Sequence, residues 1–153
     1  MSKMKKIFTI ILVALMCCVL MTLAACPNGN QGDGGEDGVY SMKVTVGNKE
    51  FTATLYNTEA AQAFAKMLPL TVDMSELNGN EKYFYLDTSL PTKIEGVGKI
   101  NAGDIMLWGA DCLVLFYKSF NTPYSYTKLG KLDDVTGLAA ALGSGGVTVT
   151  FSR

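Results

Sequence analysis

The sequence predicts a mainly β domain, folded as a closed antiparallel barrel of about eight strands with two short helices. Three observations support this prediction. Short stretches of strand length alternate apolar with polar residues along the chain after residue 39. A Gly-Asn or Asn-Gly pair, at residues 47–48 and 78–79, separates two pairs of such stretches, as in tight hairpins. Residues 103–117 are almost entirely apolar, which is typical of strands that are buried on both faces.

The residue pattern in the N-terminal part of the domain predicts a hairpin followed by a helix. Residues 42–46 and 51–55 alternate apolar with polar side chains on either side of a two-residue turn. Asn57 and Thr58 are suited to cap the N-terminus of a helix, and apolar residues then recur at helical spacing. Pro69 ends this helix, because proline cannot continue the hydrogen-bond ladder.

The pattern in the rest of the domain predicts a second hairpin over residues 70–74 and 83–86, and a central strand pair formed by the two halves of 103–117 around a turn at 109–111. It then predicts a strand over 127–132, a short helix from Asp133 or Asp134 to Leu142, and a last strand over 147–151. Gly143 is placed as the C-terminal cap of the second helix. Residues 120–126 are predicted to form a loop.

Residues 1–25 have the pattern of an export signal. Three lysines precede an uncharged apolar run from residue 7 to residue 25, although a run of this length could also span a bilayer as a helix. The Leu-Ala-Ala sequence directly before Cys26 resembles the bacterial lipobox. This resemblance implies a lipoprotein signal peptide over residues 1–25 and a lipid on Cys26. The lipid would hold the protein at the cell membrane, on its extracytoplasmic side.

Residues 26–38 are predicted to be a flexible tether between the lipidated Cys26 and the domain. Residues 27–38 contain five glycines and no large apolar side chain, so burial cannot offset the entropy lost on ordering. Residues 39–153 remain as one domain, which is long enough to bury a core of its own.

The charge of the chain argues against nucleic acid as a partner. After removal of residues 1–25 the chain keeps 10 of the 13 Lys and Arg residues and all 14 Asp and Glu residues, a formal charge of −4. Binding of nucleic acid needs clustered Lys and Arg against the phosphates, and the sequence shows no basic patch.

The sequence predicts no catalytic residue, metal or cofactor. It contains no histidine, which excludes Ser-His and Cys-His nucleophilic pairs and the usual zinc sites. Asp73, Glu76 and Glu81 lie in polar strand or turn contexts and are interpreted as solvated; whether two carboxylates meet at a glycosidase spacing stays open. Asp104 is expected to bond its own turn. Cys112 is expected to be a buried, inert thiol, because no cationic residue lies near it in the sequence.

Several segments together resemble the bacterial cyclophilin-like domains of secreted proteins and lipoproteins. In chain order they are a helix followed by Leu68-Pro69, the segment 78–83, Leu90-Pro91, the segments 102–109, 115–117 and 126–130, and the helix end at Leu142-Gly143. The resemblance covers residues 41–153. It implies an eight-stranded barrel of the cyclophilin type with two helices, in agreement with the strand count above.

The chain departs from the cyclophilins that are peptidyl-prolyl isomerases. Those enzymes carry a Phe-His-Arg segment, a Gln-Gly-Gly segment and a downstream Trp and His. Here histidine is absent, and the only arginine is Arg153, the last residue. Because nothing matches the arginine that assists proline isomerisation, no catalytic role is carried over to this chain, and the fold alone implies no activity.

Aromatic residues form the most suggestive set for binding. Nine of them lie within residues 83–126, and about half should fill the barrel because alternate strand residues point inward. Tyr and Trp suit binding grooves, since they bury a large area and keep a polar tip. The hypothesis is a shallow aromatic groove on the barrel, and core packing is the alternative for each residue singly. The predicted ligand-binding residues are Trp108, Phe116, Phe120, Tyr124 and Tyr126.

These observations predict a membrane-anchored lipoprotein whose cyclophilin-like domain binds a peptide or a small ligand without catalysis. Two alternatives remain open from the sequence. One is a weak peptidyl-prolyl isomerase that uses Asn or Tyr donors in place of arginine. The other is a structural partner of another envelope protein.

Overall fold

The computed structural model describes residues 40–153. The bounds of the strands and helices are β1 Tyr40–Val46, β2 Lys49–Leu55, α2 Glu59–Lys66, β3 Leu70–Leu77, β4 Glu81–Tyr85, β5 Glu95–Gly96, β6 Lys99–Ile100, β7 Asp104–Trp108, β8 Cys112–Phe116, β9 Phe120–Asn121, β10 Ser125–Leu132, α3 Leu138–Leu142 and β11 Val147–Ser152. The signal peptide, the lipid on Cys26 and the tether were predicted for residues outside this described part, and they stay predictions. Within it, no helix is long and apolar enough to cross a membrane.

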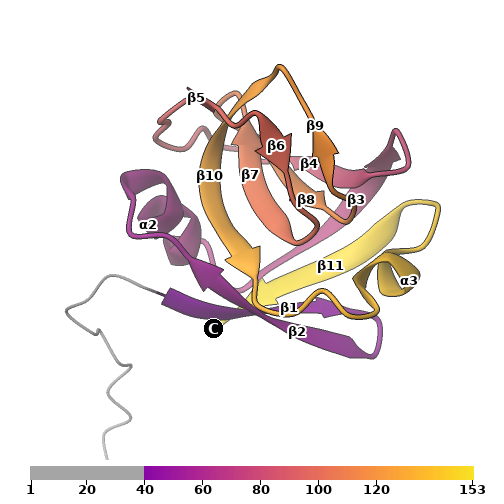
Figure 1. Ribbon diagram of the computed structural model, residues 1–153. Coiled ribbons are helices and arrows are strands. Elements are labelled where there is room, and N and C mark those ends of the chain that lie inside the picture. Colours follow the sequence, from indigo (N-terminus) through magenta and orange to yellow (C-terminus); the bar gives the residue numbers. More distant parts are fainter. Residues whose placement is uncertain (1–39) are drawn as a thin grey trace, which may run out of the picture. The chain divides into compact units, whose positions relative to one another are not determined.

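Eight antiparallel strands close into a barrel, which confirms the predicted fold class (Figure 1). The strands follow the order β2-β1-β11-β3-β4-β8-β7-β10, and β10 returns to pair with β2. Strand β5 extends this sheet by pairing with the start of β10, and β6 pairs with β9 in a separate two-stranded sheet. Every strand of the barrel therefore has a neighbour on both sides, and no barrel edge is left open.

Both predicted hairpins and the first helix are present. Val46 pairs with Lys49 across the first turn, and Leu77 pairs with Glu81 across the second. Thr58 is the N-cap of α2, and its hydroxyl oxygen accepts a hydrogen bond from the Ala61 amide at 3.2 Å. On the buried side of this helix, Phe64 stacks edge to face on Phe151 of β11, which joins the helix to the barrel core.

Helix α3 is shorter than predicted, because it begins at Leu138 and not at Asp133 or Asp134. The Asp134 carboxylate accepts a hydrogen bond from the Thr136 amide at 2.8 Å, which holds a turn in place of the first helical turn. Gly137 then has a positive φ of 81°, so the helix can start only after it. The predicted cap at the other end is correct: the Gly143 amide donates to the Ala139 carbonyl at 3.1 Å.

A buried polar cluster closes one part of the barrel between β3, β4 and the segment before β11. The Lys82 side chain is fully buried, and its ammonium group donates to Glu76 and to the carbonyls of Gly143 and Gly145, at 2.9 and 2.6 Å. The Tyr117 hydroxyl donates to the same carboxylate at 2.9 Å. The interpretation of Glu76 as a solvated residue was therefore wrong, because the carboxylate neutralises a buried cation.

The central strand pair β7–β8 is buried on both faces, as the apolar run at residues 103–117 predicted. Its inward side chains, such as Leu107 and Leu113, belong to the main barrel core. Its outward side chains belong to a second, smaller cluster, whose buried members are Ile100, Met106, Cys112, Val114, Phe116 and Tyr126. The outer cluster forms a packed apolar layer on this side of the barrel wall, and a binding site can lie on it. Asp104, at the start of β7, accepts a hydrogen bond from the Asn101 amide at 2.7 Å, so it bonds its own turn as expected.

Candidate functional site

The register of three neighbouring strands lines up the outward side chains of the barrel wall. Tyr85 of β4 pairs with Cys112 of β8, which pairs with Trp108 of β7. One step along the strands, Tyr83 pairs with Val114. Because directly paired residues of antiparallel strands point to the same face, these residues form one surface although they are far apart in the sequence.

Aromatic rings form a continuous chain across this surface. Trp108 stacks edge to face on Tyr124 and is tilted against Tyr126, with ring centroids 5.4 Å apart in both pairs. Tyr126 then contacts Phe116 at 5.6 Å, and Phe116 contacts Phe120 at 5.8 Å. These separations are in the favourable range for aromatic pairs. The five residues predicted for ligand binding therefore lie in one connected cluster.

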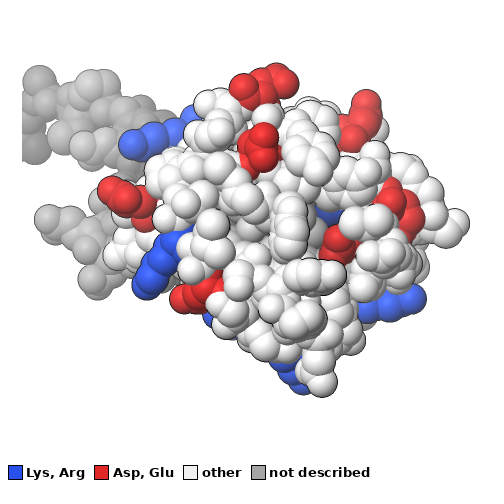
Figure 2. All heavy atoms as spheres, turned by 90° about the horizontal axis from the view of Figure 1, so that it is seen from above, with Lys and Arg blue, Asp and Glu red and all other residues white. Residues whose placement is uncertain are grey.

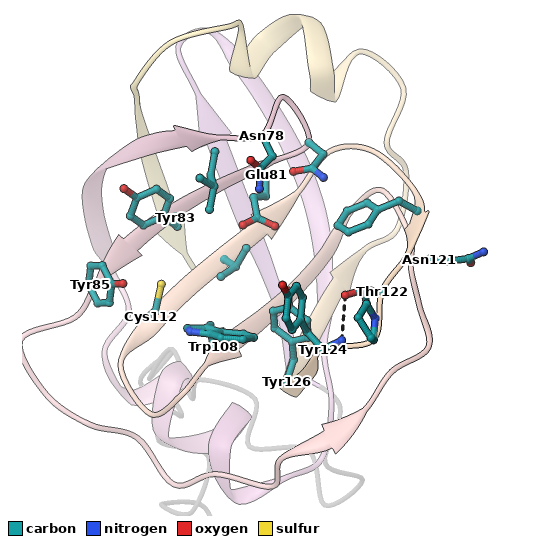
Figure 3. Close-up of a pocket in the computed structure, with 15 residues that line it drawn as sticks. Asn78, Glu81, Tyr83, Tyr85, Trp108, Cys112, Asn121, Thr122, Tyr124 and Tyr126 are labelled. Atoms are coloured by element: carbon teal, nitrogen blue, oxygen red, sulfur yellow. Dashed lines mark hydrogen bonds between the residues drawn. The ribbon is translucent and has the colours of Figure 1, made fainter.

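A pocket of about 520 Å³ opens above this aromatic cluster (Figure 3). Its volume is in the range of small-molecule sites. The walls come from the β3–β4 turn, from β4, β7 and β8, and from the segment that leads from β9 into β10. The lining residues are Leu77, Asn78, Asn80, Glu81, Tyr83, Tyr85, Trp108, Cys112, Val114, Phe120, Asn121, Thr122, Pro123, Tyr124 and Tyr126.

Hydrogen bonds hold the segment 120–124 over the pocket. The Thr122 amide donates to the Gly98 carbonyl at 3.0 Å, next to the pairing of β9 with β6. The Thr122 hydroxyl oxygen accepts a hydrogen bond from the Tyr124 amide at 3.1 Å (Figure 3). These contacts position the Tyr124 ring against Trp108 before any ligand arrives.

Glu81 is a buried carboxylate that points into the pocket (Figure 3). Burial raises the pKa of its carboxyl group, and the negative charge of Glu76 adds to the effect. The interpretation of Glu81 as a solvated residue was wrong. The polar neighbours of Glu81 in the sequence belong to a tight turn, but its own side chain lies on the covered outer face of β4.

The face seen from above in Figure 2 carries few charged groups at its centre, and the acidic and basic side chains lie mostly around it. The residues that line the pocket include neither lysine nor arginine. Among residues 40–153, no group of three or more Cys, Asp or Glu side chains could hold a metal ion.

Comparison with known proteins assigns the family. The model of the cyclophilin-like family matches residues 44–152 of the chain. This chain belongs to the cyclophilin-like family. The resemblance inferred from the sequence motifs is therefore confirmed, and the match extends over nearly the whole barrel.

A solved structure supports the same fold for this cyclophilin-like domain. The solution structure of a hypothetical protein from Archaeoglobus fulgidus is similar with a TM-score of 0.53 and 18% sequence identity. The match covers 79% of this chain and 99% of that protein. At this identity the similarity shows the fold alone. No curated protein matches the sequence.

The predicted ligand-binding residues have different positions in the cyclophilin-like domain. Trp108 and Tyr124 are 44% and 58% exposed, and both line the pocket, as does the half-buried Phe120. Tyr126 also lines it but is buried, because it belongs to strand β10 and not to the predicted loop. Phe116 is fully buried behind the wall, where it supports Phe120 and Tyr126 without lining the pocket.

Part of the pocket was not predicted from the sequence. Glu81, Tyr83 and Tyr85 are spaced by two residues, so a strand over this stretch places them on one face. That spacing was the available signal. No local pattern indicated that the same face adjoins Cys112 and Trp108, because β4 pairs with β8 about thirty residues away, and β8 in turn pairs with β7.

Cys112 lines the pocket, but its thiol is expected to be unreactive. Burial, with the negative charge of Asp111 as a second cause, raises the pKa of this thiol to about 11. Residues 39–153 contain no other cysteine. At pH 8 we expect iodoacetamide to modify this domain about a hundred-fold more slowly in the folded state than in urea, because thiolate is the reactive form. The measurement is the rate of mass increase, and equal rates in the two states would contradict the raised pKa.

Proposed function

We propose that this protein is a non-catalytic binding module that takes a small ligand, or a short segment of a peptide, into the aromatic pocket. The observation that supports the proposal is the pocket itself. It combines exposed Trp and Tyr rings with a few polar groups on a rigid barrel wall. Such a composition is typical of sites that bind ligands, since the aromatic rings supply area and the polar groups supply orientation.

The alternative of a prolyl isomerase has less support from the pocket. Isomerisation is assisted by a donor that bonds the prolyl nitrogen and weakens the amide resonance. The pocket lining has no arginine, and its side-chain donors include neutral Asn amides and Tyr hydroxyls, beside a carboxyl and a thiol. A neutral donor forms a weaker hydrogen bond than a cationic guanidinium does. A carboxylate accepts hydrogen bonds and would not stabilise the lone pair that develops on nitrogen.

An NMR titration of residues 39–153 tests both readings. This domain is one closed barrel with its own cores, and the Archaeoglobus fulgidus protein consists of the same fold. The probes are blocked X-Pro peptides in which X is alanine, glutamate or lysine. We expect shifts of the Trp108 indole and neighbouring resonances, without exchange between the cis and trans peptide. Exchange cross-peaks would establish an isomerase instead. No shift with any peptide would count against peptide binding and favour a protein partner.

Replacement of Tyr124 by alanine should separate binding from stability. Tyr124 is exposed and its main ring contact is Trp108, so we expect the free energy of unfolding to fall by no more than about 1 kcal/mol. Loss of an aromatic wall should weaken ligand binding by about ten-fold. Ile94→Ala is the matched control, because Ile94 is equally exposed and does not line the pocket. A collapse of stability in the Tyr124 variant would show a structural role.

We further propose that a lipid on Cys26 anchors the domain to the outer face of the cell membrane, with residues 26–38 as the tether. The motif Leu-Ala-Ala-Cys supports this proposal. When the full chain is expressed in bacteria with labelled palmitate, we expect the label on the protein and Cys26 at the mature N-terminus. Cys26→Ser should abolish the label, whereas Cys112→Ser should keep it. An unlabelled protein with an intact N-terminus would refute the anchor.

A further inference from the structure

The pocket contains one negatively charged side chain and no basic side chain to balance it. Glu81 is only 9% exposed, and its carboxylate forms no side-chain hydrogen bond or ion pair with another described residue, while its oxygens keep contact with solvent in the pocket. Placing a carboxylate in a covered, apolar setting costs stability unless a partner compensates for the lost water. The nearest ammonium group on its own strand, that of Lys82, lies on the opposite face of β4 and is bonded to Glu76.

A second acceptor in the pocket also lacks a donor. Asn80 precedes Glu81 and lines the same pocket, and its side-chain oxygen is buried without a hydrogen bond. Buried polar atoms of folded proteins are nearly always bonded, but this oxygen has no contact with solvent, so a ligand in the open pocket does not reach it as it stands. The Glu81 carboxylate is therefore the acceptor that points to a ligand with hydrogen-bond donors or positive charge.

The aromatic walls favour the same class of ligand. Tyr83 and Tyr85 lie on one side of the Glu81 carboxylate, and Trp108, Tyr124 and Tyr126 lie below it (Figure 3). The face of an aromatic ring carries negative potential and attracts a cation placed within about 6 Å of its centre. An anion would be repelled by the ring faces and by the carboxylate. A neutral ligand without hydrogen-bond donors would leave Glu81 without a partner, and a neutral donor would leave its charge unbalanced.

We propose that the ligand of this pocket carries an organic ammonium group, which binds between the Glu81 carboxylate and the surrounding aromatic rings. This inference rests on the proposed binding function and names the chemistry that the site selects. The ammonium group can belong to a small amine or to a lysine side chain of a peptide. The two sources share the same recognition by charge and ring faces, and the probes below distinguish them.

The test compares matched charged and neutral probes on residues 39–153 by NMR. Choline and its neutral isostere 3,3-dimethyl-1-butanol have the same shape, and n-butylammonium adds N–H donors. The Lys-Pro peptide and the same peptide acetylated on lysine form the second matched pair. We expect each cation to shift the resonances around Trp108 and to bind at least about ten-fold more tightly than its neutral partner. Tighter binding of the peptide would assign the lysine source, and tighter binding of choline or butylammonium would assign the small amine.

Glu81→Gln isolates the contribution of the carboxylate. We expect this variant to bind the cations about ten-fold more weakly and to bind the neutral isostere unchanged. We also expect its melting temperature to equal or exceed that of the parent, because the free protein no longer buries an unpaired charge. Glu50→Gln is the matched control: Glu50 is an exposed residue of β2, outside the pocket, so the same change of net charge should leave binding intact.

Three results would overturn the inference. If choline and its neutral isostere bind equally well, the pocket remains a binding site but does not select cations. If Glu81→Gln loses stability and keeps its preference for cations, the carboxylate has a structural role only. If no probe and none of the X-Pro peptides shifts the resonances of the pocket, the proposed binding function fails together with this inference.

Discussion

Replacement of Lys82 by alanine is expected to lower the free energy of unfolding by about 3 kcal/mol, because it leaves a partly buried carboxylate and two carbonyls without their cation. Lys82 has no exposed surface and is the common partner of Glu76, Gly143 and Gly145. The measurement is urea unfolding followed by circular dichroism. Amide exchange should also become faster in residues 143–146, which the ammonium group holds against β4.

Lys43→Ala is the control for this prediction. Lys43 forms an ion pair with Glu50 at 3.0 Å, but both side chains are about half exposed. Water screens such a pair, so its loss should change the free energy of unfolding by less than about 1 kcal/mol. Equal effects of the two lysine variants would show that the buried cluster does not stabilise the barrel.

Replacement of Gly130 by alanine is the second change with a large expected effect. Strand β10 has a register shift between Lys128 and Gly130, where Gly130 pairs with both Ile105 of β7 and Leu55 of β2. An added Cβ would lie 2.5 Å from the Thr54 carbonyl oxygen, which is backbone and cannot rotate away. We expect the variant to lose about 3 kcal/mol, because the strands that close the barrel must move apart.

Gly96→Ala is the matched control, since the atom nearest to its added Cβ is 3.9 Å away. Its free energy of unfolding should stay the same or rise by up to about 1 kcal/mol, because alanine restricts the unfolded chain more than glycine does. Thermal unfolding of both variants followed by circular dichroism checks the pair. Full stability of the Gly130 variant would contradict the close approach of β10 to β2.

Most strands and turns of the barrel could be predicted from the sequence, because their signals are local. Alternation identified both hairpins, and Thr58 and Gly143 marked helix ends that the structure confirms. The start of α3 was misplaced, since an aspartate that closes a turn has the same sequence signature as one that caps a helix. Tyr126 was assigned to a loop, because the proline and polar residues before it hid the start of β10.

The pocket could be predicted only in part. The aromatic residues stand out by type, so five members of the cluster could be listed before any contact was known. Which of these rings reach the pocket depends on how deeply each side chain is buried. Phe116 lies behind the pocket wall, whereas Tyr124 lies at the surface. The burial of each ring depends on the segments that cover its strand, and those segments come from distant parts of the chain.

The sequence by itself determined the strand content, the aromatic set and the resemblance to the cyclophilin-like family, which the family match confirms. The tertiary structure alone decided which residues meet and which charges are buried. Glu81 and Lys82 show the physical reason. They are neighbours with ordinary polar surroundings in the sequence, but alternation along β4 points them to opposite faces. Closure of the barrel buries the lysine in a bonded cluster, and the aromatic wall buries the glutamate in the pocket without a partner.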